Sequence, residues 1–164
     1  MSKALPIALA LLLAAPALAD EWRYENASVP IAYFDTGAAQ LQFACRGGDL
    51  AMGFWVRKPE AHVAQAGSIS VAITPDAAET STVSTTSGTS FAQEIPLIHS
   101  DGSSVIVRGP VARRWARIAQ AARDTIRVAY VRQTASGALD VFDANVFGAK
   151  GSKSAIGKVL ERCG

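Results

Sequence analysis

The sequence is poor in residues that bind metal ions, with two cysteines and two histidines among 164 residues. Cys45, His62, His99 and Cys163 are scattered singly along the chain. A structural zinc site needs about four Cys, His or carboxylate ligands at short, regular spacings. The sequence therefore predicts no metal site, and nothing in it indicates a cofactor.

Catalytic motifs are also missing, and no G-x-S-x-G nucleophile elbow occurs. The tripeptide His99-Ser100-Asp101 contains the three side-chain types of a hydrolytic triad. Triads are assembled from separate segments, because adjacent side chains in one loop cannot align in the required order. We therefore expect a turn before Gly102 and no catalytic residues. A small exported hydrolase, with a site near His99 or the Ser/Thr segment 79–90, remains the alternative.

The segment GAKGSKSAIGK at 148–158 falls short of a phosphate-binding loop. Ser152 stands where the first glycine of the motif would be, and Lys158 is followed by valine. Ser152 or Ser154 is expected to cap a helix instead, by accepting a hydrogen bond from an otherwise unpaired N–H. An anion-binding domain with Lys150 and Lys153 near this helix start stays open as an alternative.

After residue 19 the sequence has no apolar run that approaches the 18 or so residues of a transmembrane helix. The first 19 residues, MSKALPIALALLLAAPALA, combine Lys3, an apolar run from Leu5 to Leu13, and small residues at Ala17 and Ala19. This pattern is typical of a secretory signal peptide cleaved before Asp20. We expect an exported protein, periplasmic or extracellular, in which residues 20–164 form a single globular domain.

The sequence also lacks a strong net charge, which is +2 for the whole chain. This balance does not predict nucleic-acid binding. The charges are nevertheless unevenly distributed: residues 20–101 contain 4 basic and 10 acidic residues, and residues 102–164 contain 11 basic and 4 acidic ones. Seven arginines lie close together, with Asp124 the one acidic residue among them: Arg108, Arg113, Arg114, Arg117, Arg123, Arg127 and Arg132.

Two interpretations of these arginines are open. They form a basic face that binds an acidic protein partner or a polyanion of the cell envelope. Alternatively, they point in different directions and pair with the acidic first half of the chain.

Gly47-Gly48 lies between two alternating apolar runs, which predicts a two-residue β-hairpin. If position 46 pairs with 49, one face of the hairpin is wholly apolar, and a slip by one residue would destroy that pattern. The pairs predicted on this face are Cys45 with Leu50, Phe43 with Met52, and Leu41 with Phe54.

Two helices are expected. Gly109-Pro110 predicts the start of the first, because proline is well tolerated at the first helical position. We expect its apolar stripe to contain Val111, Trp115, Ile118 and Ala122, with Arg113, Arg114 and Arg117 off the stripe. The second begins near Ser152 and places Ile156, Val159, Leu160 and Cys163 on one face.

Short strands are expected around 22–25 and 30–34, in the hairpin 39–57, around 68–74, 91–98, 104–108 and 125–132, and in a final strand that begins near 139. We expect the Ser/Thr segment 79–90 to form a polar hairpin or sheet edge rather than a linker. With about eight strands and two helices, the prediction is an α+β, mainly antiparallel β domain: a curved sheet or sandwich with two helices packed on it, one of them C-terminal.

The two cysteines are each expected to face the core, Cys45 from the hairpin and Cys163 from the last helix. Because an exported chain meets an oxidising compartment, a disulfide between them is predicted. Their wide separation differs from the C-x-x-C spacing of redox-active pairs, which indicates a structural bond.

The residues Phe142, Gly148, Ala155-Ile156, Val159 and Cys163, preceded by a strand with Phe43-Ala-Cys45-Arg46, resemble small exported proteobacterial proteins. The similarity is to the invasion-associated locus B proteins and to accessory periplasmic proteins of type VI secretion. The resemblance implies a periplasmic accessory role without enzymatic activity. Our expectation is therefore a non-enzymatic binding protein that acts through protein contact. An envelope structural protein, which would form oligomers, is a further alternative.

Overall fold

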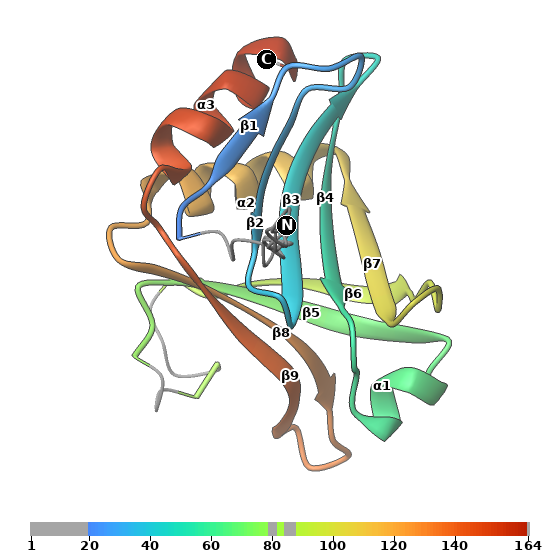
Figure 1. The fold of residues 1–164 in the computed structure, drawn as a ribbon. Coiled ribbons are helices and arrows are strands. Elements are labelled where there is room, and N and C mark those ends of the chain that lie inside the picture. Colours follow the sequence, from blue (N-terminus) through green and yellow to red (C-terminus); the bar gives the residue numbers. More distant parts are fainter. Residues whose placement is uncertain (1–19, 79–81, 84–87, 164) are drawn as a thin grey trace, which may run out of the picture.

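The computed structural model describes residues 20–78, 82–83 and 88–163. The predicted signal peptide and most of the Ser/Thr segment lie outside these residues. The described chain contains nine strands and three helices, and its strands form two antiparallel sheets (Figure 1). The α+β, mainly antiparallel fold is confirmed. A short helix, α1 (Ala61–Gln65), is present in addition to the two helices expected.

Sheet A has the strand order β1-β2-β3-β4-β7. Along β3 and β4 buried residues alternate with partly exposed ones, as a sheet covered on one face requires. The strands of sheet A are β1 (Arg23–Glu25), β2 (Ile31–Asp35), β3 (Ala39–Arg46), β4 (Asp49–Val56) and β7 (Ser103–Arg108).

The hairpin between β3 and β4 has the predicted register. Arg46 lies opposite Asp49, and the pairs Cys45 with Leu50, Phe43 with Met52 and Leu41 with Phe54 all form. Gly47 and Gly48 both adopt positive φ, 60° and 86°. A tight two-residue turn between twisted strands needs this conformation at both positions, and glycine adopts it without steric cost.

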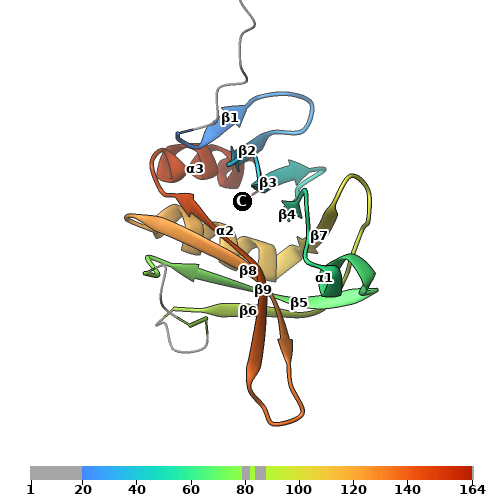
Figure 2. The ribbon, with the colours of Figure 1, turned by 60° about the horizontal axis from the view of Figure 1, so that its bottom comes forward.

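Sheet B has the order β6-β5-β8-β9, and its strands run steeply across those of sheet A (Figure 1). The hairpin of β8 and β9 extends away from the rest of the molecule (Figure 2). The sheets meet through aromatic rings, with Phe54 4.9 Å from Tyr130 and 6.3 Å from Phe147 between ring centroids. The strands of sheet B are β5 (Ser68–Pro75), β6 (Ser90–Pro96), β8 (Thr125–Gln133) and β9 (Leu139–Gly148).

Helix α2 (Gly109–Ala121) passes behind β2, β3 and β4 in Figure 1. Its buried residues are Ala112, Trp115, Ala116 and Ala119. Of the expected stripe, Trp115 is buried and Ile118 and Ala122 are partly buried against the core, but Val111 is 38% exposed, so its assignment to the stripe was wrong. Small alanine side chains let the helix backbone approach the sheet closely, and this leaves Val111 exposed and Ile118 at the edge of the buried side.

Helix α3 (Ser152–Cys163) buries Ile156, Val159 and Cys163, as predicted, while Leu160 is partly buried. The prediction that Ser152 or Ser154 caps this helix was wrong. Both residues lie inside the helix, and the hydroxyl of Ser152 is buried without a hydrogen-bond partner in the described structure.

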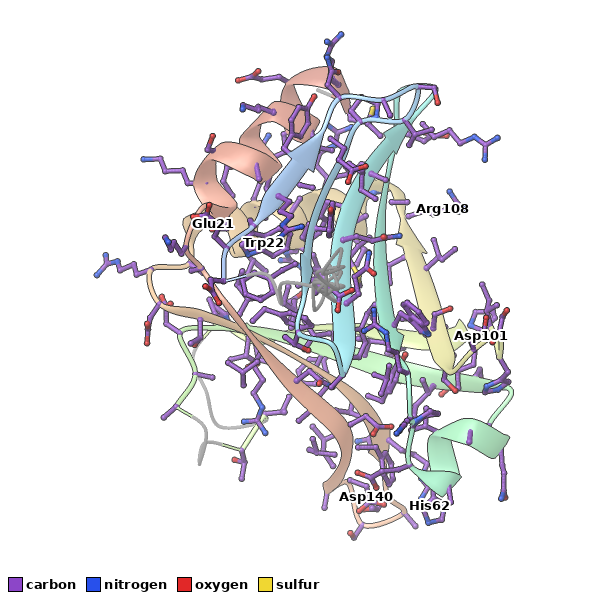
Figure 3. The ribbon with its side chains drawn as sticks, in the orientation of Figure 1. Glu21, Trp22, His62, Asp101, Arg108 and Asp140 are labelled. Atoms are coloured by element: carbon purple, nitrogen blue, oxygen red, sulfur yellow. A yellow bond between two sulfur atoms is a disulfide. The ribbon has the colours of Figure 1, made fainter. Side chains whose placement is uncertain are left out.

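Cys45 on β3 and Cys163 at the end of α3 form a disulfide across 118 residues, with a Cα–Cα distance of 5.7 Å. The start of α3 is held by Trp22, which points inward from the first strand (Figure 3). Its indole N–H donates to the Gly148 carbonyl over 2.9 Å, and its backbone N–H donates to Lys150 over 3.0 Å. No helix in the described part of the chain is long and apolar enough to cross a membrane.

Candidate functional site

Three arginines gather on the outward side of α2. Arg113 and Arg117 are four residues apart, and Arg114 and Arg117 three apart, so all three share one side of the helix. They line a shallow groove of about 900 Å³. We call this surface, Arg113, Arg114 and Arg117 with the residues beside them, the α2 arginine face. The groove is also lined by Asp49, Gly109, Pro110, Ile118 and Ala121.

The three arginines have no carboxylate partner within ion-pairing distance among the described residues. The ion pairs that form join Arg57 to Asp35, Arg132 to Asp140 and Lys150 to Glu21. Like charges three or four positions apart on a helix are destabilising by about 0.2–0.5 kcal/mol per pair. The first turn of α2 also contains no acidic residue that would offset this repulsion. The cluster therefore does not serve the stability of the helix.

Apolar side chains accompany these charges. Pro110, Ile118 and Ala121 line the groove, and Val111 is exposed at the next position around the helix. Arginine next to exposed apolar surface is the composition that protein interfaces favour. The orientation of α2 about its own axis buries its alanines and, on the other side, exposes this mixed surface of arginines and apolar residues.

The other four arginines of the cluster lie elsewhere. Arg108 lies at the end of β7 on the helix-free side of sheet A and points away from the core (Figure 3). Arg123 follows α2, and its backbone N–H donates to Asp76. Arg127 and Arg132 are on β8 of sheet B. Arg132 pairs with Asp140 on the adjacent strand and lies 5.4 Å from the Phe142 ring. The structure thus brings together three of the seven.

His99 hydrogen-bonds to Ser103, with 2.9 Å between Nδ1 and Oγ, rather than to Ser100 or Asp101. Its Nε2 lies 2.8 Å from the Ala66 carbonyl, which can only accept, so Nε2 carries the proton and Nδ1 accepts from the serine. Ser103 is 1% exposed, and its carbonyl accepts a hydrogen bond from Tyr130. A substrate cannot reach this hydroxyl. The pair fastens the 99–103 turn to the connection before β5.

A second polar contact joins Glu60 and Asp143, whose carboxylates each accept a hydrogen bond from the backbone N–H of the other residue. The Asp143 carboxylate accepts from the Glu60 N–H over 2.9 Å, and Glu60 accepts from the Asp143 N–H over 3.3 Å. Burial, together with the charge of Glu60, raises the pKa of Asp143 above its usual range, although the Glu60 N–H partly opposes this. The described residues contain no group of three or more His, Cys, Asp or Glu side chains that could hold a metal ion.

No protein-family model, curated protein or solved structure matches this chain.

Sequence reasoning found the arginines but missed their apolar neighbours. Ala112, Trp115, Ala116 and Ala119 have the i, i+3, i+4, i+7 spacing of a buried stripe. Choosing that stripe would have predicted Val111 and Ile118 beside the arginines. The contact of His99 with Ser103 had no comparable signal, since it depends on how the 99–103 turn closes.

Proposed function

We propose that the protein is an exported, non-enzymatic binding protein that contacts an acidic protein partner in the cell envelope through the α2 arginine face. One observation carries the proposal: three neighbouring arginines on one helix have no carboxylate partner among the described residues and stand beside exposed apolar side chains. The resemblance to small exported accessory proteins supports the same role.

An acidic protein segment suits this surface better than a bare polyanion does. A guanidinium group binds a carboxylate through two parallel hydrogen bonds. Pro110 and Val111 are exposed next to the arginines and would be left in water by a purely charged polymer. A segment with acidic and apolar residues would bury both kinds of side chain, which is how interface energy is usually concentrated.

The proposed location is the periplasm or the extracellular medium. The Cys45–Cys163 disulfide supports it, because such bonds persist in oxidising compartments. The predicted signal peptide supports it independently from the sequence.

The test is a pull-down from an extract of the native cell envelope with the purified protein and the triple variant Arg113→Glu/Arg114→Glu/Arg117→Glu. Glutamate has nearly the helix propensity of arginine, so α2 should stay folded. A matched control changes charge equally elsewhere, with Lys58→Glu/Lys153→Glu/Arg162→Glu. These three residues are exposed and form no ion pair with described residues.

We expect the native protein and the control to retain one protein partner at low salt, and the arginine variant to lose it. Retention should fall as ionic strength rises, because exposed charges are screened. Equal retention by all three proteins, or retention insensitive to salt, would exclude the proposal. Retention of envelope polysaccharide without protein would favour the polyanion instead.

A further inference from the structure

The helix-free face of sheet A contains a hollow centred on Gly53. Figure 1 views this face, since α2 passes behind the sheet. Two neighbouring rows of outward-facing residues cross β3, β4 and β7 there. One row is Gln40, Trp55 and Ser104, and the other is Gln42, Gly53 and Ile106.

Gly53 leaves room for the side chain of Gln42, which lies directly over it. A Cβ at this position would lie 2.9 Å from Nε2 of Gln42. The backbone here does not adopt positive φ, so its conformation does not require glycine. Gln42 and Gly53, together with Trp55 and Ile106, line a groove of about 220 Å³ on the sheet surface, which is separate from the α2 arginine face.

Trp55 forms a fixed wall of this groove. Its indole N–H donates to the Asp101 carbonyl over 3.0 Å, which sets the orientation of the ring. The Arg57 guanidinium lies 4.3 Å from the ring centroid and is itself paired with Asp35. Because Arg57 does not line the groove, it occupies the side of the ring away from it. The ring is therefore held in place before any ligand arrives.

Two side-chain amides supply hydrogen-bonding groups. Nε2 of Gln40 donates to Oε1 of Gln42 over 3.0 Å, which orders both amides. Among the described residues nothing accepts from Nε2 of Gln42, which lies over Gly53. Ile106, 41% exposed, adds an apolar patch on the opposite side. No charged residue lines the groove.

We propose that this groove binds a neutral sugar residue of a glycan. A sugar ring offers an apolar C–H surface to an aromatic wall such as Trp55. Its hydroxyls both donate and accept, which matches an amide with unused N–H groups. An uncharged lining gives a phosphate or carboxylate ligand no counter-charge. The site is on a different face from the α2 arginine face and does not depend on the function proposed above.

The test titrates the purified, ¹⁵N-labelled protein with maltotriose and with triacetylchitotriose. The readouts are the indole signal of Trp55 and the side-chain amide of Gln42. The other two tryptophans, Trp22 and Trp115, are buried and serve as internal references. We expect saturable shifts of the Trp55 and Gln42 signals with at least one sugar at up to about 10 mM, since single-ring sites bind in the millimolar range.

Gly53→Thr places a Cβ where the Gln42 side chain lies and therefore displaces this side chain from its position in the groove. It should weaken sugar binding at least tenfold, and the domain should stay folded because threonine suits a strand and the Gln42 side chain is flexible. Ala51→Thr is the matched control, because Ala51 is on the same face of the same strand but does not line the groove. If Gly53→Thr fails to fold, Gln42→Leu serves as a second variant, and it should also lose sugar binding.

No shift with either sugar would overturn the proposal. Shifts that persist unchanged in Gly53→Thr or Gln42→Leu would do the same, as would shifts of Trp22 and Trp115 equal to that of Trp55. Inorganic phosphate should leave the Trp55 signal in place, and an equal response to it would contradict the assignment to a neutral ligand.

Discussion

At the residue scale, Asp143 is a carboxyl group whose ionised form the fold disfavours. Burial, together with the charge of Glu60, raises its pKa. The stability that its protonated form contributes is present below the unfolded pKa, near 3.9, and is lost as pH rises through the higher folded pKa. Its left-handed backbone, φ 46°, is one that asparagine also tolerates.

We therefore expect Asp143→Asn to be more stable than the native protein at pH 7, with the difference vanishing near pH 3. The asparagine carbonyl can still accept the Glu60 N–H. Urea unfolding between pH 3 and pH 8 measures this. A variant less stable than the native protein at neutral pH would show that the charge of Asp143 is favourable in the fold.

Asp76 shows the opposite behaviour. Burial raises the pKa of Asp76. Hydrogen bonds from the backbone N–H groups of Asp124, Arg123 and Thr125 lower it by more than burial raises it, so the pKa lies below its usual range. These donors lie 2.8, 2.9 and 3.3 Å from Oδ1 and fix the chain between α2 and β8. The stability contributed by the ionised form is present above the unfolded pKa and is lost as pH falls through the folded one.

Asp76→Asn should destabilise the protein at pH 7 by on the order of 1 kcal/mol, because charge-assisted hydrogen bonds become neutral ones at an exposed site. Asparagine also tolerates the φ of 51° at this position. The loss should shrink as the pH falls through the lowered pKa of the folded state, where the native carboxylate takes up a proton as well. Parallel unfolding curves for the two proteins at pH 7 and pH 2.5 decide this, and a constant difference would contradict it.

At the element scale, the hairpin of β3 and β4 could be predicted completely, because Gly47-Gly48 fixes the turn and the turn fixes the register. Helix α3 could also be predicted from its apolar stripe, but the residue that caps its start could not. The orientation of α2 could not be predicted fully, since the expected stripe included Val111, which is exposed, and left out three buried alanines. Close packing against a sheet selected alanines instead, and the apolar part of the candidate site was missed for the same reason.

Paired substitutions test the orientation of α2. Ala116→Leu adds volume to a fully buried position and should destabilise the protein by about 1–3 kcal/mol. Val111→Ala, on the 38% exposed side, should change stability by less than about 0.5 kcal/mol. Chemical denaturation of both variants measures the difference. A larger loss from Val111→Ala would restore the stripe expected from the sequence.

At the scale of the whole molecule, the disulfide joins the tip of the hairpin to the last turn of α3. In the loop-entropy model, a cross-link that closes a loop of this length restricts the unfolded chain and thereby stabilises the folded state by about 5 kcal/mol. Sheet A and α3 also share a buried core, which includes Phe43, Ile156 and Val159. The double variant Cys45→Ser/Cys163→Ser should therefore remain folded but melt at a lower temperature. Identical melting of the native protein with and without reductant would contradict this role.

The two sides of α2 differ in their role in the fold. One side of α2 closes the core with alanines and Trp115, and the other presents the arginines. The charged side forms no ion pair with the described residues, so we expect that its charges can be changed without unfolding the domain. The sequence shows that seven arginines lie close together along the chain. The three-dimensional structure is needed to separate the three that share a groove from the four that do not.

The most direct measurement is photo-crosslinking in the cells that produce the protein. A benzophenone amino acid at Ala121 lies in the groove and leaves all three arginines in place, and the same probe at exposed Ala64 on α1 is the control. Our account predicts one discrete protein adduct from position 121 that disappears with Arg113→Glu/Arg114→Glu/Arg117→Glu, and none from position 64. No adduct from 121, or the same adduct from both positions, would contradict it.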